Sequence, residues 1–223
     1  MKKKLTLWML IAALCMCMFA CRHEAAIAPA PTVCFNEEVL PIFQSNCSKS
    51  NCHSAERSES GYTLDNYANI IKKGIIPGNA ANSKIYNILL AENGDKIMPP
   101  PGQYPLSDEQ KNLIKTWINE QAENTVNCGT CDSTQFTFTA HVQPIIKAHC
   151  LGCHGGNAND GYGIPLNTYD EIKERISGGL SSELYLSITH AADVNPMPQD
   201  GNKLSDCKIA VIKRWLQAGA PNN

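Results

Sequence analysis

The sequence predicts an all-α fold in which two similar helical domains follow each other along the chain. Segments of the first half recur in the same order in the second half, and apolar side chains in both halves follow helical spacing. Alternating β-branched residues, which indicate strands, are nearly absent apart from the stretch QFTFT at residues 135–139.

The internal repeat covers most of the chain. FNEEVLPIFQSNC at 35–47 aligns with FTAHVQPIIKAHC at 138–150, and SKIYNIL at 83–89 aligns with SELYLSI at 182–188. PLSDEQKNLIKTWI at 105–118 aligns with KLSDCKIAVIKRWL at 203–216. The spacing between matched segments changes by only a few residues, which short loop insertions explain. We therefore predict one domain at residues 34–128 and a second at 129–223.

The matched segments are expected to form helices. Ser107 and Gln110 have the spacing of a capping box and open a helix with an apolar face. That face and its repeat consist of Leu113, Ile114, Trp117 and Ile118, and of Val211, Ile212, Trp215 and Leu216. Earlier helices are expected over 36–46, 67–73 and 83–92 and at their counterparts. We interpret the recurring aromatic pairs as packing residues: Tyr67 and Tyr169, Tyr86 and Tyr185, Trp117 and Trp215.

The N-terminus has the pattern of an export signal. Three lysines at 2–4 precede an apolar run at 5–20, which is short for a membrane span and typical of a signal peptide. Ala20 before Cys21 resembles the lipobox of bacterial lipoproteins, whose cysteine is acylated. We therefore expect a lipoprotein signal peptide at 1–20, a lipid on Cys21 and a tether at 21–33. The protein is then expected in the periplasm, or at the outer membrane or cell surface, anchored to the membrane by the lipid.

The charge balance argues against nucleic acid as a partner. The chain has 19 Lys and Arg against 21 Asp and Glu, a formal charge of −2. Loss of the signal peptide removes three of the lysines and leaves a more acidic chain, in which no basic run suggests nucleic-acid binding.

Two cysteine motifs occupy matching places in the repeat. CLGCH at 150–154 has the spacing for covalent attachment of a c-type haem. CSKSNCH at 47–53 is two residues longer, yet Cys47, Cys52 and His53 correspond to Cys150, Cys153 and His154. The alternative is one zinc site that pools the four cysteines, but it leaves both histidines and the duplication unexplained.

The mature chain keeps two of the six methionines, Met98 and Met197. Both precede proline in loops at matching positions of the repeat, and proline keeps the preceding residue extended. A thioether opposite an imidazole is the axial ligand pair of cytochromes c. We therefore predict that Met98 and Met197 are the sixth ligands of two irons whose fifth ligands are His53 and His154.

Four other cysteines of the mature chain, Cys34, Cys128, Cys131 and Cys207, allow three disulfide pairings. Cys34 with Cys128 and Cys131 with Cys207 would give each domain its own bridge, worth about 4 kcal/mol on a loop-entropy basis. We expect a structural role, since Cys128 and Cys131 lack both a following histidine and a βαβ context.

Two further histidines lie near the predicted ligands. His149 is interpreted as a residue at the end of a helix. His190 precedes Met197 by seven positions, is matched by Ala91 in the first half, and is interpreted as exposed or in contact with a haem propionate.

These motifs together resemble the Planctomycete-type cytochrome c domain, present twice over residues 34–223. The residues that carry the resemblance are VLPIFQSNCSKSNCH, MPPP and SDEQKNLIKTWI in one copy, and VQPIIKAHCLGCHG, MPQ and SDCKIAVIKRWLQAGAP in the other. The resemblance implies a helical cytochrome fold wrapped around covalent haem and a role in electron transfer. It places one haem on Cys47, Cys52, His53 and Met98, and a second on Cys150, Cys153, His154 and Met197.

The expected function is that of a dihaem electron carrier between a redox donor and a redox acceptor, with no catalytic residues. Six-coordinate iron leaves no position for a substrate. The alternatives are a dihaem peroxidase, in which one haem releases its distal ligand, a haem-based gas sensor, and a structural lipoprotein without haem.

Overall fold

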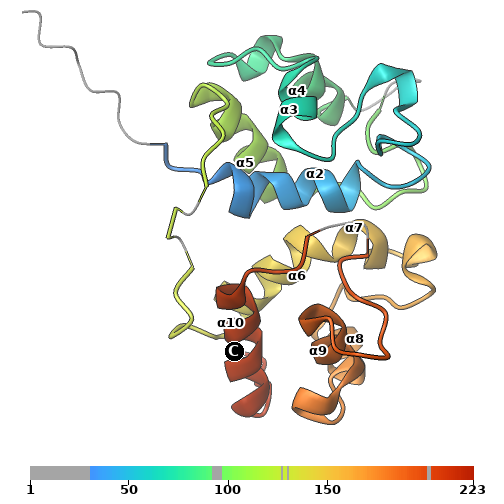
Figure 1. Cartoon of the computed structure of the whole chain (residues 1–223), viewed down its shortest axis with the longest axis vertical. Helices are drawn as coiled ribbons and strands as arrows, with labels where there is room; N and C mark the ends of the chain where they lie inside the picture. Colours follow the sequence, from blue (N-terminus) through green and yellow to red (C-terminus); the bar gives the residue numbers. More distant parts are fainter. Residues whose placement is uncertain (1–30, 92–96, 127, 130, 200–201) are drawn as a thin grey trace, which may run out of the picture. The chain divides into compact units, whose positions relative to one another are not determined.

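Helices and turns make up the secondary structure of the described residues, which contain no strand, as the predicted all-α fold requires. The computed structural model describes residues 31–223 apart from 92–96, 127, 130 and 200–201 (Figure 1). In that part of the chain, no helix has the length and apolar character needed to cross a membrane. The predicted signal peptide and Cys21 lie outside the described residues.

Residues 31–223 cluster as one compact unit with two buried apolar clusters, one from each half of the repeat. The α-helices of the first half are α2 (Leu40–Asn46), α3 (Tyr67–Ile71), α4 (Lys84–Leu89) and α5 (Asp108–Asn119). Those of the second half are α6 (Gln143–His149), α7 (Leu151–His154), α8 (Tyr169–Arg175), α9 (Glu183–Thr189) and α10 (Asp206–Gln217). The domain boundary between residues 128 and 129 stays a prediction.

Short helical turns complete the two halves. A π-helical turn precedes the first long helix of each half, at Phe35–Val39 and at Phe138–Val142. The 3₁₀ turns are Glu59–Gly61, Ala80–Asn82, Asn159–Gly161 and Gly179–Ser181. The strand signal at 135–139 was therefore wrong: Phe138 starts a π-helical turn, because its ring is buried in the second core instead of alternating across a sheet.

Helix α5 confirms the predicted capping box. The Ser107 hydroxyl accepts from the Gln110 backbone N–H at 3.3 Å, and the Gln110 side chain accepts from the Ser107 N–H at 2.8 Å. The two bonds satisfy N–H groups that the first turn of a helix leaves unpaired. On the predicted apolar face Ile114, Trp117 and Ile118 are buried, and the matching face of α10 is buried in the same way.

The recurring aromatic residues pack as expected. In the first half the Phe35 ring lies 4.9 Å from Trp117 and 5.2 Å from Tyr67, between ring centroids. The Tyr67 hydroxyl donates to the Ala122 carbonyl at 2.9 Å. The second half repeats these contacts with Phe138, Trp215, Tyr169 and Ala220. The duplication therefore extends to individual buried hydrogen bonds.

Helix α4 is shorter than the helix predicted over 83–92. It ends at Leu89, where the Leu90 N–H turns back to the Asn87 carbonyl. The next carbonyl, that of Ile88, accepts from the N–H of Met98 at 3.2 Å. The loop that carries Met98 is thus bonded to a carbonyl near the end of α4. In the second half, the N–H of Met197 donates in the same way to the Ser187 carbonyl of α9.

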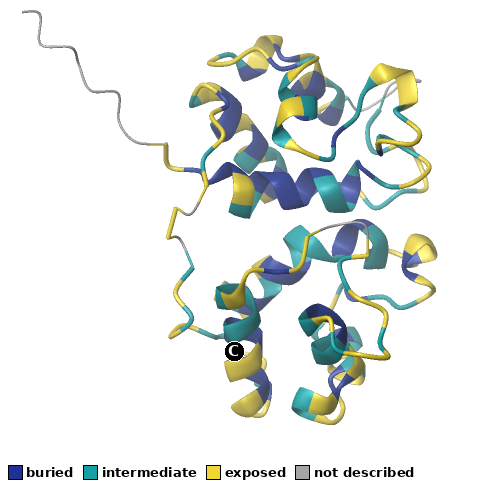
Figure 2. Ribbon diagram, in the orientation of Figure 1, coloured by how far each residue is buried: buried dark blue, intermediate teal, exposed yellow. Residues whose placement is uncertain are grey.

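The halves contact each other through the helices that precede their cysteine motifs. Helix α2 packs against α6 and α7, and Figure 2 shows that α2 is largely buried. Side chains also donate across the contact: Gln110 Nε2 to the Lys147 carbonyl at 3.1 Å, and Lys208 Nζ to the Glu37 carbonyl at 2.7 Å. The Ser45 hydroxyl near the end of α2 also donates to the Ala148 carbonyl near the end of α6, so this contact brings the two cysteine motifs toward each other.

Two disulfides confirm the expected pairing. Cys34 is bonded to Cys128 and Cys131 to Cys207, which spans 94 and 76 residues of chain. Each bridge therefore joins the beginning of one predicted domain to a position near the end of its repeat. The remaining cysteines of the described chain, Cys47, Cys52, Cys150 and Cys153, form no disulfide among the described residues.

Loss of one bridge should destabilise the protein measurably. Replacing Cys131 and Cys207 together by alanine is expected to lower the free energy of unfolding by about 2–5 kcal/mol, because the unfolded chain gains freedom. Urea denaturation followed by circular dichroism measures this change. The matched Cys34→Ala/Cys128→Ala variant should lose a similar amount. A loss below about 1 kcal/mol in both variants would contradict a structural role for these bridges.

Candidate functional site

One helical turn sets the relative positions of the residues of the second cysteine motif. Cys150 ends α6 and opens α7, whose turn contains Cys153 and His154. The backbone N–H groups of Cys153 and His154 both donate to the Cys150 carbonyl, at 3.1 and 2.9 Å. Residues three and four apart share one face of a helix, so both thiols and the imidazole lie on the same side.

The His154 imidazole is fixed by the backbone that follows it. Its Nδ1 lies 2.8 Å from the Ile164 carbonyl, and its own carbonyl accepts from the Leu166 N–H at 2.9 Å. Because a carbonyl only accepts, the bond requires a proton on Nδ1 and leaves the lone pair of Nε2 available for a metal. Gly161 permits this packing, since a Cβ there would lie 2.6 Å from Nδ1.

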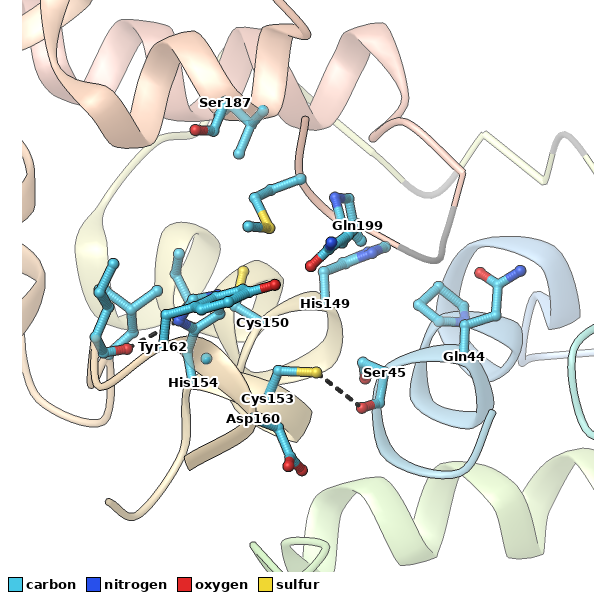
Figure 3. Close-up of a pocket in the computed structure, with 18 of the residues that line it drawn as sticks. Gln44, Ser45, His149, Cys150, Cys153, His154, Asp160, Tyr162, Ser187 and Gln199 are labelled. Atoms are coloured by element: carbon cyan, nitrogen blue, oxygen red, sulfur yellow. Dashed lines mark hydrogen bonds between the residues drawn. The ribbon is translucent and has the colours of Figure 1, made fainter. Parts of the chain in front are cut away.

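A cavity of about 440 Å³ lies beside this imidazole (Figure 3). It is lined by Cys150, Cys153, His154 and Met197, the four residues predicted for the second site. Much of its wall is apolar and comes from Ile145, Ile146, Leu166, Ile188, Leu204 and Ile212. The volume is within the range of about 300–1,000 Å³ typical of ligand and cofactor sites. The fold therefore gathers residues from three separate parts of the second repeat around one cavity.

Met197 is held in its loop by two hydrogen bonds. Its N–H donates to the Ser187 carbonyl at 3.1 Å, and its carbonyl lies 3.1 Å from Nε2 of His190. His190 is exposed, as one of the two interpretations held, but its contact with the Met197 backbone was not foreseen. Two features of the sequence could have indicated this contact. His190 lies seven residues before Met197, and the first half has Ala91 at the matching position.

Two polar side chains in the cavity wall have unmet hydrogen-bonding capacity. Nε2 of His149 and Nε of Arg175 are buried and have no hydrogen-bond partner among the described residues. Burial, with a smaller contribution from the Lys208 ammonium, lowers the pKa of His149 to about 3. His149 is the last residue of α6, as predicted, but sequence reasoning missed that it and Arg175 line the cavity. Buried polar groups require a partner, so the cavity is suited to a ligand that is largely apolar with an anionic edge.

In the first motif His53 makes the same two hydrogen bonds as His154, despite the longer loop. We call this pair of bonds the clamp. Nδ1 of His53 lies 3.3 Å from the Tyr62 carbonyl, and the His53 carbonyl accepts from the Leu64 N–H at 2.9 Å. The His53 N–H donates to the Cys47 carbonyl at 3.0 Å, so the extra residues return the chain to the same place. Cys47 and Met98 both pack against the first apolar cluster.

Cys52 and its loop face the other half of the protein. Together with Lys49, Ser50 and Asn51 it lines the cavity that contains His154. The first motif therefore contributes to the wall of the second site.

The two motifs approach each other at a glycine. A Cβ on Gly152 would overlap the carbonyl oxygen of Ser45, so only glycine allows the chains to come this close. The Cys153 thiol donates to the same oxygen at 4.0 Å (Figure 3), and the Ser45 hydroxyl donates to the Ala148 carbonyl at 2.8 Å. Ser45 is two residues before Cys47, so the end of α2 joins the two sites.

These four cysteines are not arranged as the alternative zinc site in the described part of the chain. No group of three or more His, Cys, Asp or Glu side chains in the described part of the chain is placed to hold a metal ion. Burial raises the pKa of Cys47 and of Cys150 to about 12, which keeps both thiols protonated at neutral pH.

Residues 50–102 match the family model described as Planctomycete cytochrome C. The match supports a cytochrome c-like family and includes Cys52, His53 and Met98 of the first site. It implies covalently bound haem c and an electron-carrying role. No curated protein and no solved structure matches the chain.

The second cavity fits a haem c group by its donor set. Two thiols and an imidazole with a free Nε2 stand on one helical turn, and a thioether lines the same cavity. The apolar wall suits the porphyrin, and Nε of Arg175, which has no hydrogen-bond partner among the described residues, suits a carboxylate at its edge.

A side chain at Gly152 should separate the two motifs. Gly152→Ala is expected to destabilise the protein by about 1–3 kcal/mol, because a buried Cβ meets backbone atoms that cannot rotate away. Thermal unfolding of the purified variant measures the loss. Gly163→Ala is the control: its Cβ meets nothing within 4 Å, although its φ of 72° carries a cost of its own. Equal or smaller destabilisation by Gly152→Ala would contradict the close approach.

Proposed function

We propose that the protein is an exported dihaem c-type cytochrome that carries electrons between two redox partners. The observation that carries the proposal is the cavity lined by Cys150, Cys153, His154 and Met197, beside an imidazole whose Nδ1 is already occupied. The matching clamp on His53 and the family match over residues 50–102 support a haem in the first half as well.

The proposed ligand sets follow the repeat. Cys47 and Cys52 would hold the first haem through thioethers, and His53 and Met98 would ligate its iron. In the second half the corresponding residues are Cys150, Cys153, His154 and Met197. When bound, haem c supplies a one-electron Fe(III)/Fe(II) couple, and thioether ligation raises its reduction potential.

The chain's own residues suit electron transfer. In each half the carbonyl that accepts from Nδ1 keeps the imidazole in one orientation and makes it a more basic ligand. The apolar wall of the second cavity would shield a bound iron from water. With a histidine nitrogen on one side of each iron and a methionine sulfur on the other, no position would be left for peroxide or a gas, which favours a carrier over a peroxidase or a sensor.

The place and the partners of the protein belong to the same proposal. Lipid on Cys21 would anchor the mature chain in the periplasm or at the outer membrane or cell surface. The acidic balance of the mature chain, increased by the haem propionates, would favour a donor and an acceptor with positively charged docking surfaces.

Denaturing mass spectrometry of the full chain, matured in a host that attaches haem c, tests the proposal. We expect the mass of two haems together with an acyl group on Cys21. Cys150→Ala/Cys153→Ala should lose one haem and keep the other, and Cys47→Ala/Cys52→Ala should do the same. A mature protein with one haem or none would contradict the dihaem assignment.

Axial ligation is tested on the same material. The reduced wild-type protein is expected not to bind carbon monoxide, because both axial positions of each iron are taken. Met98→Ala and Met197→Ala should each create one binding site for the gas, measured as a change in the Soret band. Binding of carbon monoxide by the wild type would favour the sensor, and turnover of hydrogen peroxide with a reduced donor would favour the peroxidase.

A further inference from the structure

The loop between Cys47 and Cys52 is the place where the two halves differ most in their cysteine motifs. It has two residues more than the loop in CLGCH, and Lys49, Ser50 and Asn51 all line the cavity of the second site. The longer loop of the first motif therefore forms part of the cavity wall in the second half of the protein.

Lys49 makes the closest polar contacts of this loop. Its ammonium lies 2.8 Å from Asp160 Oδ2, across 111 residues of sequence, and 2.7 Å from Gln103 Oε1. The Lys49 side chain is only 12% exposed, against 40% for Asp160. A shielded ammonium requires such partners, and the attraction between the two charges is screened less than at an open surface.

The ion pair joins the loop of the first cysteine motif to a turn beside His154. Lys49 is two residues after Cys47, and Asp160 belongs to the turn Asn159–Gly161, whose last residue packs against the His154 imidazole. Both side chains line the second cavity. The other charged side chains in that wall are Arg175 and Glu183. A charge left alone at the position of this pair would therefore act on both sites.

We infer that the Lys49–Asp160 ion pair is an electrostatic element shared by the two haem sites, and that its two charges act on their reduction potentials with opposite signs. The inference rests on the proposed dihaem function. Reduction adds one electron to an iron, so a nearby cation stabilises the reduced form and a nearby anion the oxidised form. Within the intact pair the two effects largely cancel, and removal of one partner leaves the other uncompensated.

The test is a spectroelectrochemical titration of the haem-loaded full chain, with the mean of the two midpoint potentials as the readout. Lys49→Gln should lower the mean and Asp160→Asn should raise it. We expect a change of about tenfold in the oxidised-to-reduced ratio at a fixed potential, which is 59 mV for a one-electron couple. The double variant should return close to the wild type.

The opposite signs of the two potential shifts distinguish an effect of charge from a disturbance of the cavity wall. If either substitution merely opened the cavity to water, both variants would shift the mean in the same direction. Lys49→Arg keeps the charge and should keep the wild-type mean. Lys111→Gln is the matched control, because it breaks a lysine–aspartate pair, with Asp108 at 3.6 Å, whose residues do not line the described cavity. It should leave the mean unchanged.

The outcomes distinguish a failure of this inference from a failure of the proposed dihaem function. Haem content of all variants is measured first by denaturing mass spectrometry. Two haems with unmoved potentials, or with shifts of the same sign, would overturn the inference and leave the dihaem proposal standing. Absence of haem from the wild type would overturn the proposed function itself. If Lys49→Gln fails to mature, the sign of the shift in the partly exposed Asp160→Asn variant decides alone.

Discussion

The proposed function depends on one hydrogen bond that occurs twice, from Nδ1 of a histidine to a backbone carbonyl. The carbonyl belongs to Tyr62 in the first half and to Ile164 in the second. In each half the histidine carbonyl also accepts an N–H from a buried leucine, Leu64 or Leu166, which lies two residues after Tyr62 or Ile164. These two bonds determine which ring nitrogen can meet a metal. The thiols, the methionine loop and the apolar wall are useful only because this nitrogen has a fixed direction.

The two halves keep the clamp and differ where they meet. The longer loop of the first motif reaches the second cavity, and Gly152 lets the end of α2 approach CLGCH. His190 supports the methionine loop only in the second half. The similar sequence segments of the two halves thus have similar backbone contacts around both histidines, and the differences lie where the halves contact each other.

Much of the fold could be predicted from local patterns. The repeat, the capped helix α5 and the disulfide partners follow from spacing along the chain, which the structure preserves. The lining of the cavity by His149 and Arg175 and the Lys49–Asp160 pair could not, because they arise from packing between distant segments. The strand signal at 135–139 failed for the same reason: burial of Phe138 against Trp215 outweighed the local preference of its neighbours.

We propose that each half holds an iron between a histidine nitrogen and a methionine sulfur. X-ray absorption at the iron edge of the haem-loaded protein tests this ligation, because the fine structure reports the ligand elements around the metal. We expect one sulfur and five nitrogen ligands for each iron, and loss of half of the sulfur contribution in Met98→Ala. A wild-type spectrum with nitrogen or oxygen ligands only would contradict it.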